Sequence, residues 1–444
     1  MSNFDGRRLH FVGIGGAGMS GLALVAKALG AEVSGSDQAR SSYTDRLVDA
    51  GIEPAIDHDA ANLPSGAEVV VSTAIPESNP ELAAARSAGA RVLHRGALLG
   101  ELTRLKRSIA IAGTHGKTTT CGMVAHVLRE TGRDPAFVIG GELRSAGTNA
   151  AWGEGEWIVV EADESDRSFL ELARDVAVVT NVELDHHATY GSLADLRATF
   201  GEFAAPAELR VLGDDVELAG AGRELHYGIE NGDLSAEEVE LRPLGARFTV
   251  DGVAVQLNVP GRHNVLNALA ALAACREAGV PLTEAAPAIA DFGGTGRRFE
   301  ARGQTATGAR VFDDYAHHPT EVRATLEAAL TLGADRVVAC FQAHLYSRTR
   351  ELAQAFGAAL AIADVVVVVD IYPARERQED FPGITGLLIA QAAADAGRGK
   401  HVWWLPSMED AAQMLERTAG AGDVVLTLGA GDVDKLAAKL VEAG

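Results

Sequence analysis

The sequence lacks the features that mark several classes of protein. Its 444 residues contain only three cysteines, Cys121, Cys275 and Cys340, too far apart to suggest a disulfide framework or a metal cluster. No apolar stretch approaches the roughly 20 residues needed to span a membrane, and no apolar export signal follows Met1. We therefore expect a protein of the reducing cytoplasm with no membrane partner.

Positive charge is also scarce. The chain has 39 Lys and Arg residues against 61 Asp and Glu, a formal net charge of −22. Because nucleic acids select basic surfaces, no nucleic-acid partner is expected, and any anionic substrate must be bound by local groups. Between Lys106 and Lys400 the only lysine is Lys117, although arginine is used freely there. A lone lysine indicates a chemical requirement at that position.

Short apolar runs alternate with helical patterns along the whole chain, which predicts an α/β protein with mostly parallel sheets. Its length corresponds to about three domains of roughly 150 residues. The runs fall into three groups, and we predict domains at 1–106, 107–296 and 297–444. Short alternating strands within 224–260 predict an antiparallel patch attached to the second sheet.

A glycine-rich loop with one lysine follows the predicted strand 108–111 and precedes a helical segment. Backbone N–H groups at a helix N-terminus bind phosphate, a lysine adds charge for the outer phosphates, and a threonine hydroxyl can join a Mg²⁺ shell. Ile111 occupies the place of the first glycine in the full Walker spacing, so this is a shorter variant. An ordinary turn is disfavoured because strand, glycines, lysine and threonine coincide. The predicted ATP-binding residues of this loop are Gly113, Thr114, His115, Gly116, Lys117, Thr118 and Thr119.

A second glycine loop lies near the N-terminus, where the strand 9–12 leads into Gly13-Ile14-Gly15-Gly16-Ala17-Gly18. With Asp37 at the end of the next strand, it satisfies the dinucleotide-binding pattern. That pattern requires only a diphosphate at the helix N-terminus, so UDP fits as well as NAD does. A ligand-free turn also remains open, whereas the NAD interpretation leaves the Lys117 loop unexplained.

Carboxylates and histidines gather where two further strands end. The strand 157–160 leads into the acidic cluster 161–166, and the strand 176–179 leads into 180–187. Because the carboxyl ends of parallel strands meet at one edge of a sheet, these groups could share Mg²⁺ with bound phosphates. The alternative is a solvated acidic loop with a helix-capping aspartate.

Three later segments carry polar groups in unusual combinations. Asn264 and Asn267 lie on one helical face and could read an adenine edge, although Asn264 is also a plausible helix N-cap. Arg297 and Arg298 could neutralise phosphate charge. The segment 313–318, Asp-Asp-Tyr-Ala-His-His, precedes a probable helix start, and 342–350 offers cations for a small amino-acid carboxylate.

The order of four motifs resembles the Mur ligase family, and within it the branch that adds L-alanine. The motifs are Gly-Ile-Gly-Gly-Ala-Gly-Met-Ser-Gly, Gly-Thr-His-Gly-Lys-Thr-Thr-Thr, Glu-Ala-Asp-Glu-Ser-Asp and Asp-Asp-Tyr-Ala-His-His-Pro-Thr-Glu. The resemblance implies an N-terminal Rossmann-like UDP-binding domain, a central P-loop ATPase-like domain and a C-terminal Rossmann-like domain. It implies ATP and Mg²⁺ as cofactors, UDP-N-acetylmuramate and L-alanine as substrates, and a monomer or weak homodimer.

The resemblance also implies roles for individual residues. The predicted UDP-sugar-binding residues are Gly15, Gly16, Ala17, Gly18, Ser36, Asp37, Ser72 and Thr73. The predicted magnesium ligands are Thr118, Glu161 and His186, and the predicted catalytic residues are Lys117, Glu161, His186, His187, Arg297 and Arg298, with His187 near the muramate carboxylate. ATP would also contact Asn264, Asn267, Asp314 and His317, and the amino acid would contact His344 and Arg348.

Two features qualify this resemblance. Leu345 stands where the family has an arginine, which leaves His344 and Arg348 as the remaining amino-acid ligands of that loop. Other Mur branches use a carbamylated lysine, which the absence of lysine between Lys117 and Lys400 excludes here. The implied reaction proceeds through an acyl phosphate. The rival interpretations are a related ligase that attaches a recycled tripeptide, an NAD-dependent oxidoreductase, and a nucleotide-binding regulator.

Overall fold

The computed structural model describes residues 4–186 and 189–442. These residues form three sheets in which parallel pairing predominates, and the predicted α/β class is confirmed. By contacts between Cα positions the chain divides into two compact units. Unit 1 comprises 1–237, 249–255 and 266–292, and unit 2 comprises 238–248, 256–265 and 293–444.

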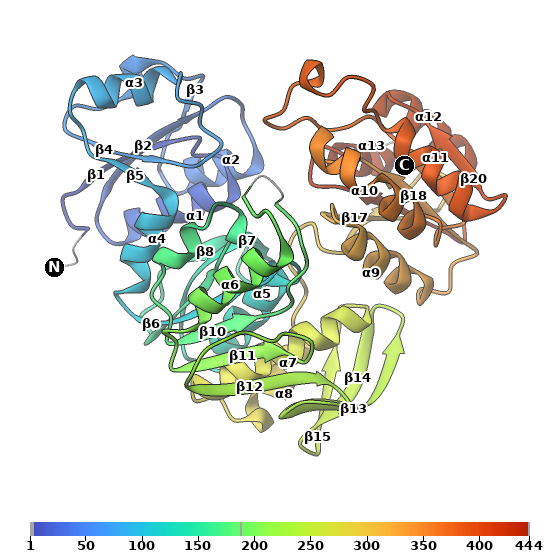
Figure 1. Cartoon of the computed structure of the whole chain (residues 1–444), viewed down its shortest axis with the longest axis horizontal. Helices are drawn as coiled ribbons and strands as arrows, with labels where there is room; N and C mark the ends of the chain where they lie inside the picture. The colour runs from blue at the N-terminus through green and yellow to red at the C-terminus, as the bar shows by residue number, and fades with distance from the viewer. Residues whose placement is uncertain (1–3, 187–188, 443–444) are drawn as a thin grey trace. The chain divides into compact units, whose positions relative to one another are not determined.

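The first sheet has five parallel strands in the order β3-β2-β1-β4-β5 (Figure 1). Its strands are β1 (Arg8–Val12), β2 (Glu32–Asp37), β3 (Ala55–Ile56), β4 (Glu68–Val71) and β5 (Val92–His94). Its helices are α1 (Ala17–Ala28), α2 (Ser42–Asp49), η1 (Ala60–Asn62), α3 (Pro80–Ser87) and α4 (Arg95–Thr103). From β1 the chain adds β2 and β3 on one side of the sheet and then β4 and β5 on the other, so the strand order switches sides between β1 and β4. Ligands of such sheets bind outside the carboxyl ends of the strands at that point.

The second sheet has ten strands in the order β15-β14-β13-β12-β11-β10-β6-β9-β7-β8. Its strands are β6 (Arg107–Ala112), β7 (Ala136–Leu143), β8 (Thr148–Ala151), β9 (Trp157–Glu161), β10 (Val176–Val179), β11 (Leu209–Gly213), β12 (Arg223–Ile229), β13 (Leu234–Arg242), β14 (Gly245–Val250) and β15 (Val253–Leu257). Its helices are α5 (Lys117–Glu130), η2 (Glu164–Asp166), η3 (Ser168–Glu171), α6 (Leu193–Ala204), α7 (Arg262–Glu277) and α8 (Leu282–Ala290). The strand β6 lies between β10 and β9, so the loops after these three strands converge at one edge.

The predicted antiparallel patch is correct only in part. Two-residue connections join β13 to β14 and β14 to β15, which are neighbours, and so short a turn can join only antiparallel strands. The strand β12, however, pairs in parallel with both β11 and β13. Positive φ at Glu230 and Gly232 lets the chain fold back within a few residues and run beside β12 in the same direction.

The third sheet lies in unit 2 and has the order β16-β17-β21-β18-β19-β20, parallel except for β16. Its strands are β16 (Glu300–Gln304), β17 (Arg310–Asp314), β18 (Arg336–Phe341), β19 (Val365–Val368), β20 (His401–Trp404) and β21 (Asp423–Leu428). Its helices are α9 (Pro319–Leu330), α10 (Tyr346–Leu360), η4 (Gln378–Asp380), α11 (Leu387–Gly397), α12 (Met408–Thr418) and α13 (Asp434–Glu442). Apolar clusters fill both faces of this sheet.

The first two sheets share one apolar core. A single cluster of buried side chains extends from Phe4 in the first region to Val216 in the second. The helix α1 packs on β7 and β8, where a Cβ at Gly21 would lie 3.2 Å from the Cβ of Ala150. Among the described helices, none is both long and apolar enough to cross a membrane.

Candidate active site

The segment between β6 and α5 forms the predicted phosphate loop. Its glycines have backbone conformations that residues with side chains rarely adopt, with φ of +129° at Gly113 and +83° at Gly116. A Cβ at Gly113 would lie 2.9 Å from the backbone nitrogen of Thr180, and a Cβ at Gly116 would collide with the amide of Asn267. The loop ends at the N-terminus of α5, whose first N–H groups lack helical acceptors and favour an anion.

The ammonium of Lys117 is held by this loop and by one carboxylate. Its Nζ donates to the carbonyl oxygens of Gly113 at 2.5 Å and Thr114 at 3.1 Å, and lies 3.0 Å from Oε2 of Glu164. Burial alone would lower the pKa of Lys117, but Glu164 and the neighbouring carboxylates outweigh burial and raise it. The residue therefore stays charged, beside the N–H groups that would bind phosphate.

His186 contacts the same carboxylate. Its Nε2 lies 3.5 Å from Oε1 of Glu164 and 3.9 Å from Oδ2 of Asp185. Burial would lower the pKa of His186, but the hydrogen bond to Glu164 and the charge of Asp185 raise it overall. The structure thus groups His186 with Glu164 and Lys117. The adjacent His187, predicted to lie near the muramate carboxylate, falls outside the described residues.

Thr118 and Glu161 form the second polar pair beside the loop. The hydroxyl of Thr118 donates to Oε1 of Glu161 at 3.0 Å, and the N–H of Gly140 donates to Oε2 at 2.8 Å. Glu161 ends β9 and is partly exposed. Hydroxyl and carboxylate oxygens are the ligands that Mg²⁺ prefers, so this pair fits a magnesium ion. Thr119, the next residue of the loop, is buried in the first turn of α5.

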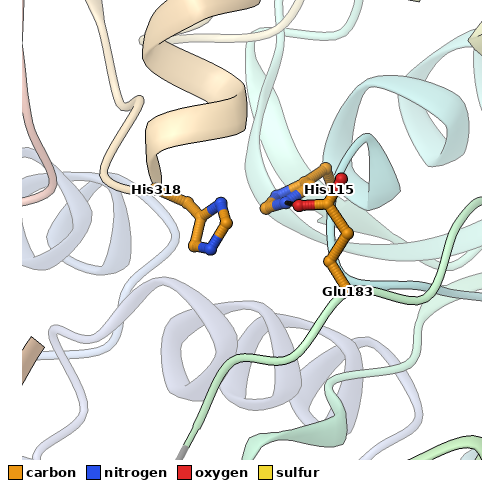
Figure 2. A group of neighbouring side chains, drawn as sticks. All are labelled: His115, Glu183 and His318. Carbon is orange, nitrogen blue, oxygen red and sulfur yellow. Dashed lines mark hydrogen bonds and ion pairs between the residues drawn. The ribbon is translucent and has the colours of Figure 1, made fainter. Parts of the chain in front are cut away.

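The other loop side chains are tied to the segment after β10. The hydroxyl of Thr114 donates to the carbonyl of Glu183 and accepts from its N–H, both at 2.9 Å. The N–H of His115 donates to Oδ1 of Asn181 at 2.8 Å. Figure 2 shows the imidazole of His115 near Glu183, with Nε2 at 3.4 Å from Oε2. His318, also drawn there, belongs to unit 2.

The two predicted adenine-reading amides lie in the first turns of α7. Asn264 is not the N-cap, because α7 begins at Arg262 and the Asn264 side chain donates to the carbonyl of Pro260 at 2.7 Å. The amide of Asn267 lies against Gly116 of the phosphate loop. The structure therefore brings Asn267 to the predicted ATP loop.

The first glycine loop follows β1 and ends in the first turn of α1. Its Gly15 N–H donates to Oδ2 of Asp37 at 2.8 Å, so the aspartate lies at the loop as predicted. A Cβ at Gly15 would lie 2.8 Å from a methyl carbon of Thr44 and 3.0 Å from the Asp37 carboxylate. The N-cap of α1 is Gly16, which has no side chain to occupy the free N–H groups. The same turn includes Ala17 and Gly18, which are partly exposed.

Ser36 occupies a different place from the one its predicted role requires. Its hydroxyl is fully buried and donates to Oε2 of Glu81 at 2.6 Å, while its carbonyl accepts from the N–H groups of Gly13 and Ile14. His10 also contacts Glu81, at 3.1 Å. Ser36 therefore shapes the loop from beneath and does not present its hydroxyl to a ligand.

Ser72 and Thr73 follow β4, the neighbour of β1 in the sheet. Ser72 is partly buried and Thr73 is exposed. Because β1 and β4 are parallel, both residues lie at the same edge as the first glycine loop. The strand order switches sides between β1 and β4, so the predicted position of both residues beside the loop agrees with the topology.

In unit 2, Arg297 and Arg298 have different surroundings. Nε of Arg297 lies 2.9 Å from Oδ2 of the buried Asp313, and its other nitrogens donate to the carbonyls of Gly429 and Gly431. Arg298 makes a longer contact of 4.0 Å to Glu321. Arg297 therefore joins the segment before β16 to the loop after β21.

Asp314 and His317 follow β17, as predicted. The carboxylate of Asp314 accepts N–H groups from Phe299 at 2.7 Å and Ala316 at 2.8 Å. Burial raises its pKa to about 6, although Arg298 acts in the opposite direction. Nδ1 of His317 lies 3.1 Å from the carbonyl of Tyr315. Both residues organise the turn before α9.

The predicted amino-acid loop lies between β18 and α10. NH1 of the buried Arg348 lies 3.3 Å from Nδ1 of His344, and the His344 ring stacks on Tyr372 with centroids 5.9 Å apart. Leu345 has φ of +74°, and its N–H donates to the carbonyl of Tyr372. The structure thus brings His344 and Arg348 together, and holds Leu345 in a strained backbone conformation.

Three charged residues next to these loops, Glu164, Asp163 and Arg95, have no role predicted from the sequence. Glu164 is the buried partner of Lys117, and Asp163 lies 2.6 Å from a guanidinium nitrogen of Arg95. Burial would raise the pKa of Asp163, but Arg95 and Lys117 lower it below its ordinary value. The acidic cluster 161–166 was visible in the sequence, but nothing in the sequence paired it with Arg95.

Three models of one family match this chain in order. They are described as the Mur ligase family catalytic domain at 8–107, the Mur ligase middle domain at 111–275 and the Mur ligase glutamate ligase domain at 297–431. The chain belongs to the Mur ligase family.

Named relatives are similar over nearly their whole length. A UDP-N-acetylmuramate–L-alanine ligase of Acidithiobacillus ferrooxidans is 47% identical over 98% of this chain and 97% of its own. The crystal structure of the UDP-N-acetylmuramate–alanine ligase of Thermotoga maritima has a TM-score of 0.86 and 30% identity, covering 98% of each chain. A murein peptide ligase of Psychrobacter arcticus has a TM-score of 0.74 and 25% identity, covering 99% of this chain and 98% of its own. The predicted family is confirmed.

Proposed function

We propose that this chain is an ATP-dependent ligase that joins L-alanine to the lactyl carboxylate of UDP-N-acetylmuramate, a step in peptidoglycan precursor synthesis. The presence of two separate phosphate-binding loops in unit 1 carries this proposal, because the reaction needs one nucleotide to be bound as substrate and another to be consumed. An oxidoreductase would leave the Lys117 loop without a role. The names of the full-length relatives support this pair of substrates.

The loop at α5 would bind ATP. Lys117 would neutralise charge on the outer phosphates, and Arg297 and Arg298 remain the guanidinium groups predicted for the same task. Phosphoryl transfer depends mainly on positioning and charge neutralisation, which are what these groups supply. Asn267, whose amide lies against Gly116, would contact the nucleotide from the α7 side. Asn264, Asp314 and His317 remain predicted ATP-binding residues.

A magnesium ion would be held by the Thr118 hydroxyl and the Glu161 carboxylate, and it would neutralise phosphate charge. His186 remains a predicted ligand, although the contact that the structure gives it is with Glu164. We also retain the predicted domain boundaries near 106 and 296, a cytoplasmic location and a monomer or weak homodimer as proposals. The three free and buried cysteines fit a reducing compartment.

The chemistry would proceed in two transfers. The lactyl carboxylate oxygen bonds to the γ-phosphorus of ATP while the bond to ADP breaks, which forms an acyl phosphate. The alanine amine then attacks the acyl carbon, loses a proton, and phosphate leaves. Water must be excluded between the transfers, because the acyl phosphate would otherwise hydrolyse.

His344 and Arg348 would bind the alanine carboxylate. Their contact at 3.3 Å places a guanidinium and an imidazole together near the start of α10. A charge-assisted contact in a partly dry pocket contributes about 2 kcal/mol, so we expect Arg348→Ala to raise the KM for alanine at least about tenfold. Steady-state kinetics on each substrate in turn will test this. A rise in the KM for ATP alone would move Arg348 to the nucleotide site.

The overall reaction can be tested with the purified chain, ATP, Mg²⁺, UDP-N-acetylmuramate and radiolabelled alanine. The expected result is label in the UDP-sugar, with one ADP and one phosphate released for each alanine attached. Incorporation of the tripeptide L-Ala-γ-D-Glu-diaminopimelate in place of alanine would favour the murein peptide ligase activity named for one structural relative. Oxidation of NADH without label transfer would overturn the proposal in favour of an oxidoreductase.

A further inference from the structure

Arg95 is a cation to which the proposed function gives no role. It is the first residue of α4, and its NH2 lies 2.6 Å from Oδ2 of Asp163 and 3.6 Å from Oδ2 of Asp166. On its other side, NH1 lies 3.2 Å from the position that a Cβ on Gly18 would occupy. The guanidinium therefore lies between the first turn of α1 and the acidic segment after β9.

The first turn of α1 is a place where a cation alone is unfavourable. The exposed N–H groups of a helix N-terminus carry partial positive charge, and a guanidinium beside them adds more. The turn runs Ala17-Gly18-Met19-Ser20 with Gly16 as its N-cap, so it contains no acidic side chain to offset that charge. A concentration of donors and positive charge of this kind is the usual form of an anion site.

The carboxylates beside Arg95 leave part of its hydrogen-bonding capacity unused. In residues 4–186 and 189–442, Nε of Arg95 is buried and has no hydrogen-bond partner. Its side chain as a whole remains 24% exposed, so part of Arg95 is accessible to a ligand. A planar guanidinium with spare donors matches two phosphate oxygens.

We propose that Arg95 is a diphosphate-binding residue of the sugar-nucleotide site, acting with the N–H groups at the start of α1. This inference rests on the proposed function, because it assumes that the first glycine loop binds the UDP group. Arg95 also connects the two proposed nucleotide sites through the start of η2. Asp163, which contacts Arg95, precedes Glu164, which contacts Lys117, so the cations of both sites pair with adjacent residues at the start of η2.

A purely structural role for Arg95 predicts a different result and has a matched control. Arg104 follows the last residue of the same helix, and its NH2 donates to the carbonyl of Glu171 at 2.9 Å. Both arginines thus fasten α4 to the η2–η3 segment, from opposite ends of the helix. Only Arg95 lies at the glycine loop. Loss of helix docking would affect both variants, whereas loss of a phosphate ligand would affect Arg95 alone.

The test is calorimetric binding of UDP-N-acetylmuramate, and separately of a non-hydrolysable ATP analogue, to wild type, Arg95→Met, Arg95→Lys and Arg104→Met. We expect Arg95→Met to weaken UDP-sugar binding about 30-fold, which is about 2 kcal/mol, and Arg95→Lys to recover part of this. Arg104→Met should bind the UDP-sugar within about threefold of wild type. The ATP analogue should bind all four proteins with similar affinity.

The outcomes separate this inference from the proposed function. Failure of wild type to bind the UDP-sugar would overturn the proposed function itself. Normal wild-type binding together with Arg95→Met binding within twofold, or an equal loss in Arg104→Met, would overturn the role of Arg95 only. Should Arg95→Met not fold, Arg95→Lys keeps the charge but lacks the planar fork, and unchanged UDP-sugar affinity in that variant would likewise overturn it.

Discussion

The two glycine loops of unit 1 each follow a strand and lead into a helix, but they need glycine for partly different reasons. In the loop after β6, Gly113 and Gly116 have φ values of +129° and +83°, which residues other than glycine rarely adopt. In the loop after β1, Gly13 also has a positive φ, +78°, but Gly15 has an ordinary backbone conformation, and crowding by Thr44 and Asp37 excludes a side chain there. A glycine-rich pattern can therefore arise from two separate constraints, a positive φ at one position and steric crowding at another.

The loops also obtain their charge differently. The loop after β6 supplies its own cation, Lys117, which Glu164 keeps charged. The loop after β1 contains no charged residue and instead lies beside the Asp37 carboxylate and the Arg95 guanidinium of α4. The comparison indicates that the proposed ATP loop carries its own cation, whereas the proposed UDP loop lies beside a cation of another helix.

The largest effect is expected for Lys117→Ala. Removing a cation that neutralises transferred phosphate should lower ligase turnover at least about 100-fold. The variant should still fold, although leaving the buried Glu164 with His186 but without Lys117 costs on the order of 3 kcal/mol of stability. Lys106→Ala is the matched control, since Lys106 precedes the same strand and makes no contact with the loop. Phosphate release and chemical denaturation measure both quantities, and near wild-type turnover would refute the assignment.

A smaller and reciprocal effect is expected when each loop is blocked. Gly15→Val should weaken binding of the UDP-sugar at least about 30-fold and leave ATP binding within a few-fold, because the new side chain meets Thr44 and Asp37. Gly116→Val should do the reverse, because it forces Asn267 away and strains a positive φ. Titration calorimetry with each nucleotide will test both. Loss of both ligands by either variant would indicate one shared site or misfolding.

The smallest effect concerns the buried network beneath the first loop. Burial would raise the pKa of Glu81, but hydrogen bonds from His10, Ser36 and Asn62 outweigh it and lower the pKa to about 2. Its ordinary value is 4.5. A carboxyl group with a lowered pKa in the folded state contributes stability above pH 4.5, and this contribution is lost as the pH falls through 4.5 towards 2.

Glu81→Gln should therefore reduce the acid sensitivity of folding. Between pH 6 and pH 4 the wild type should lose about 1 kcal/mol of unfolding free energy through this group, and the variant should not. Urea denaturation at the two pH values measures the difference. Asp37→Asn, at the same loop but partly exposed, is the comparison variant. Equal acid sensitivity of Glu81→Gln and wild type would show that the network does not stabilise the loop.

Sequence patterns predicted the parts of the site that are local. Each glycine loop lies between one strand and the next helix, so a run of a few residues such as Gly113–Lys117 was enough to predict the turn. The convergence of Glu161 with Thr118 was also predictable, because parallel strands end at one edge. The α/β class followed from the alternation of strands and helices.

The remaining features depend on tertiary packing. Arg95 meets Asp163 across 68 positions of sequence, and no local pattern relates them. The family resemblance implied that Ser36 contacts the UDP group, but its buried hydroxyl donates to Glu81 of α3. The parallel pairing of β12 and β13 depends on the tight reversal at Glu230 and Gly232, whose φ values the residue types do not determine.

The packing of α1 has a consequence for how the chain unfolds. The side-chain amide of Asn149 in β8 donates to the carbonyl of Ala17 at 2.6 Å, and the same buried cluster continues through both sheets. A shared interior of this kind couples the two regions in one cooperative transition. Differential scanning calorimetry of the whole chain should then record one endotherm in which the first two sheets unfold together, and a fragment ending at residue 106 would expose the face of α1 around Gly21 to water. The predicted domain boundary at residue 106 would thus separate the proposed UDP-binding region from the proposed ATP-binding region, although the two regions unfold as one unit.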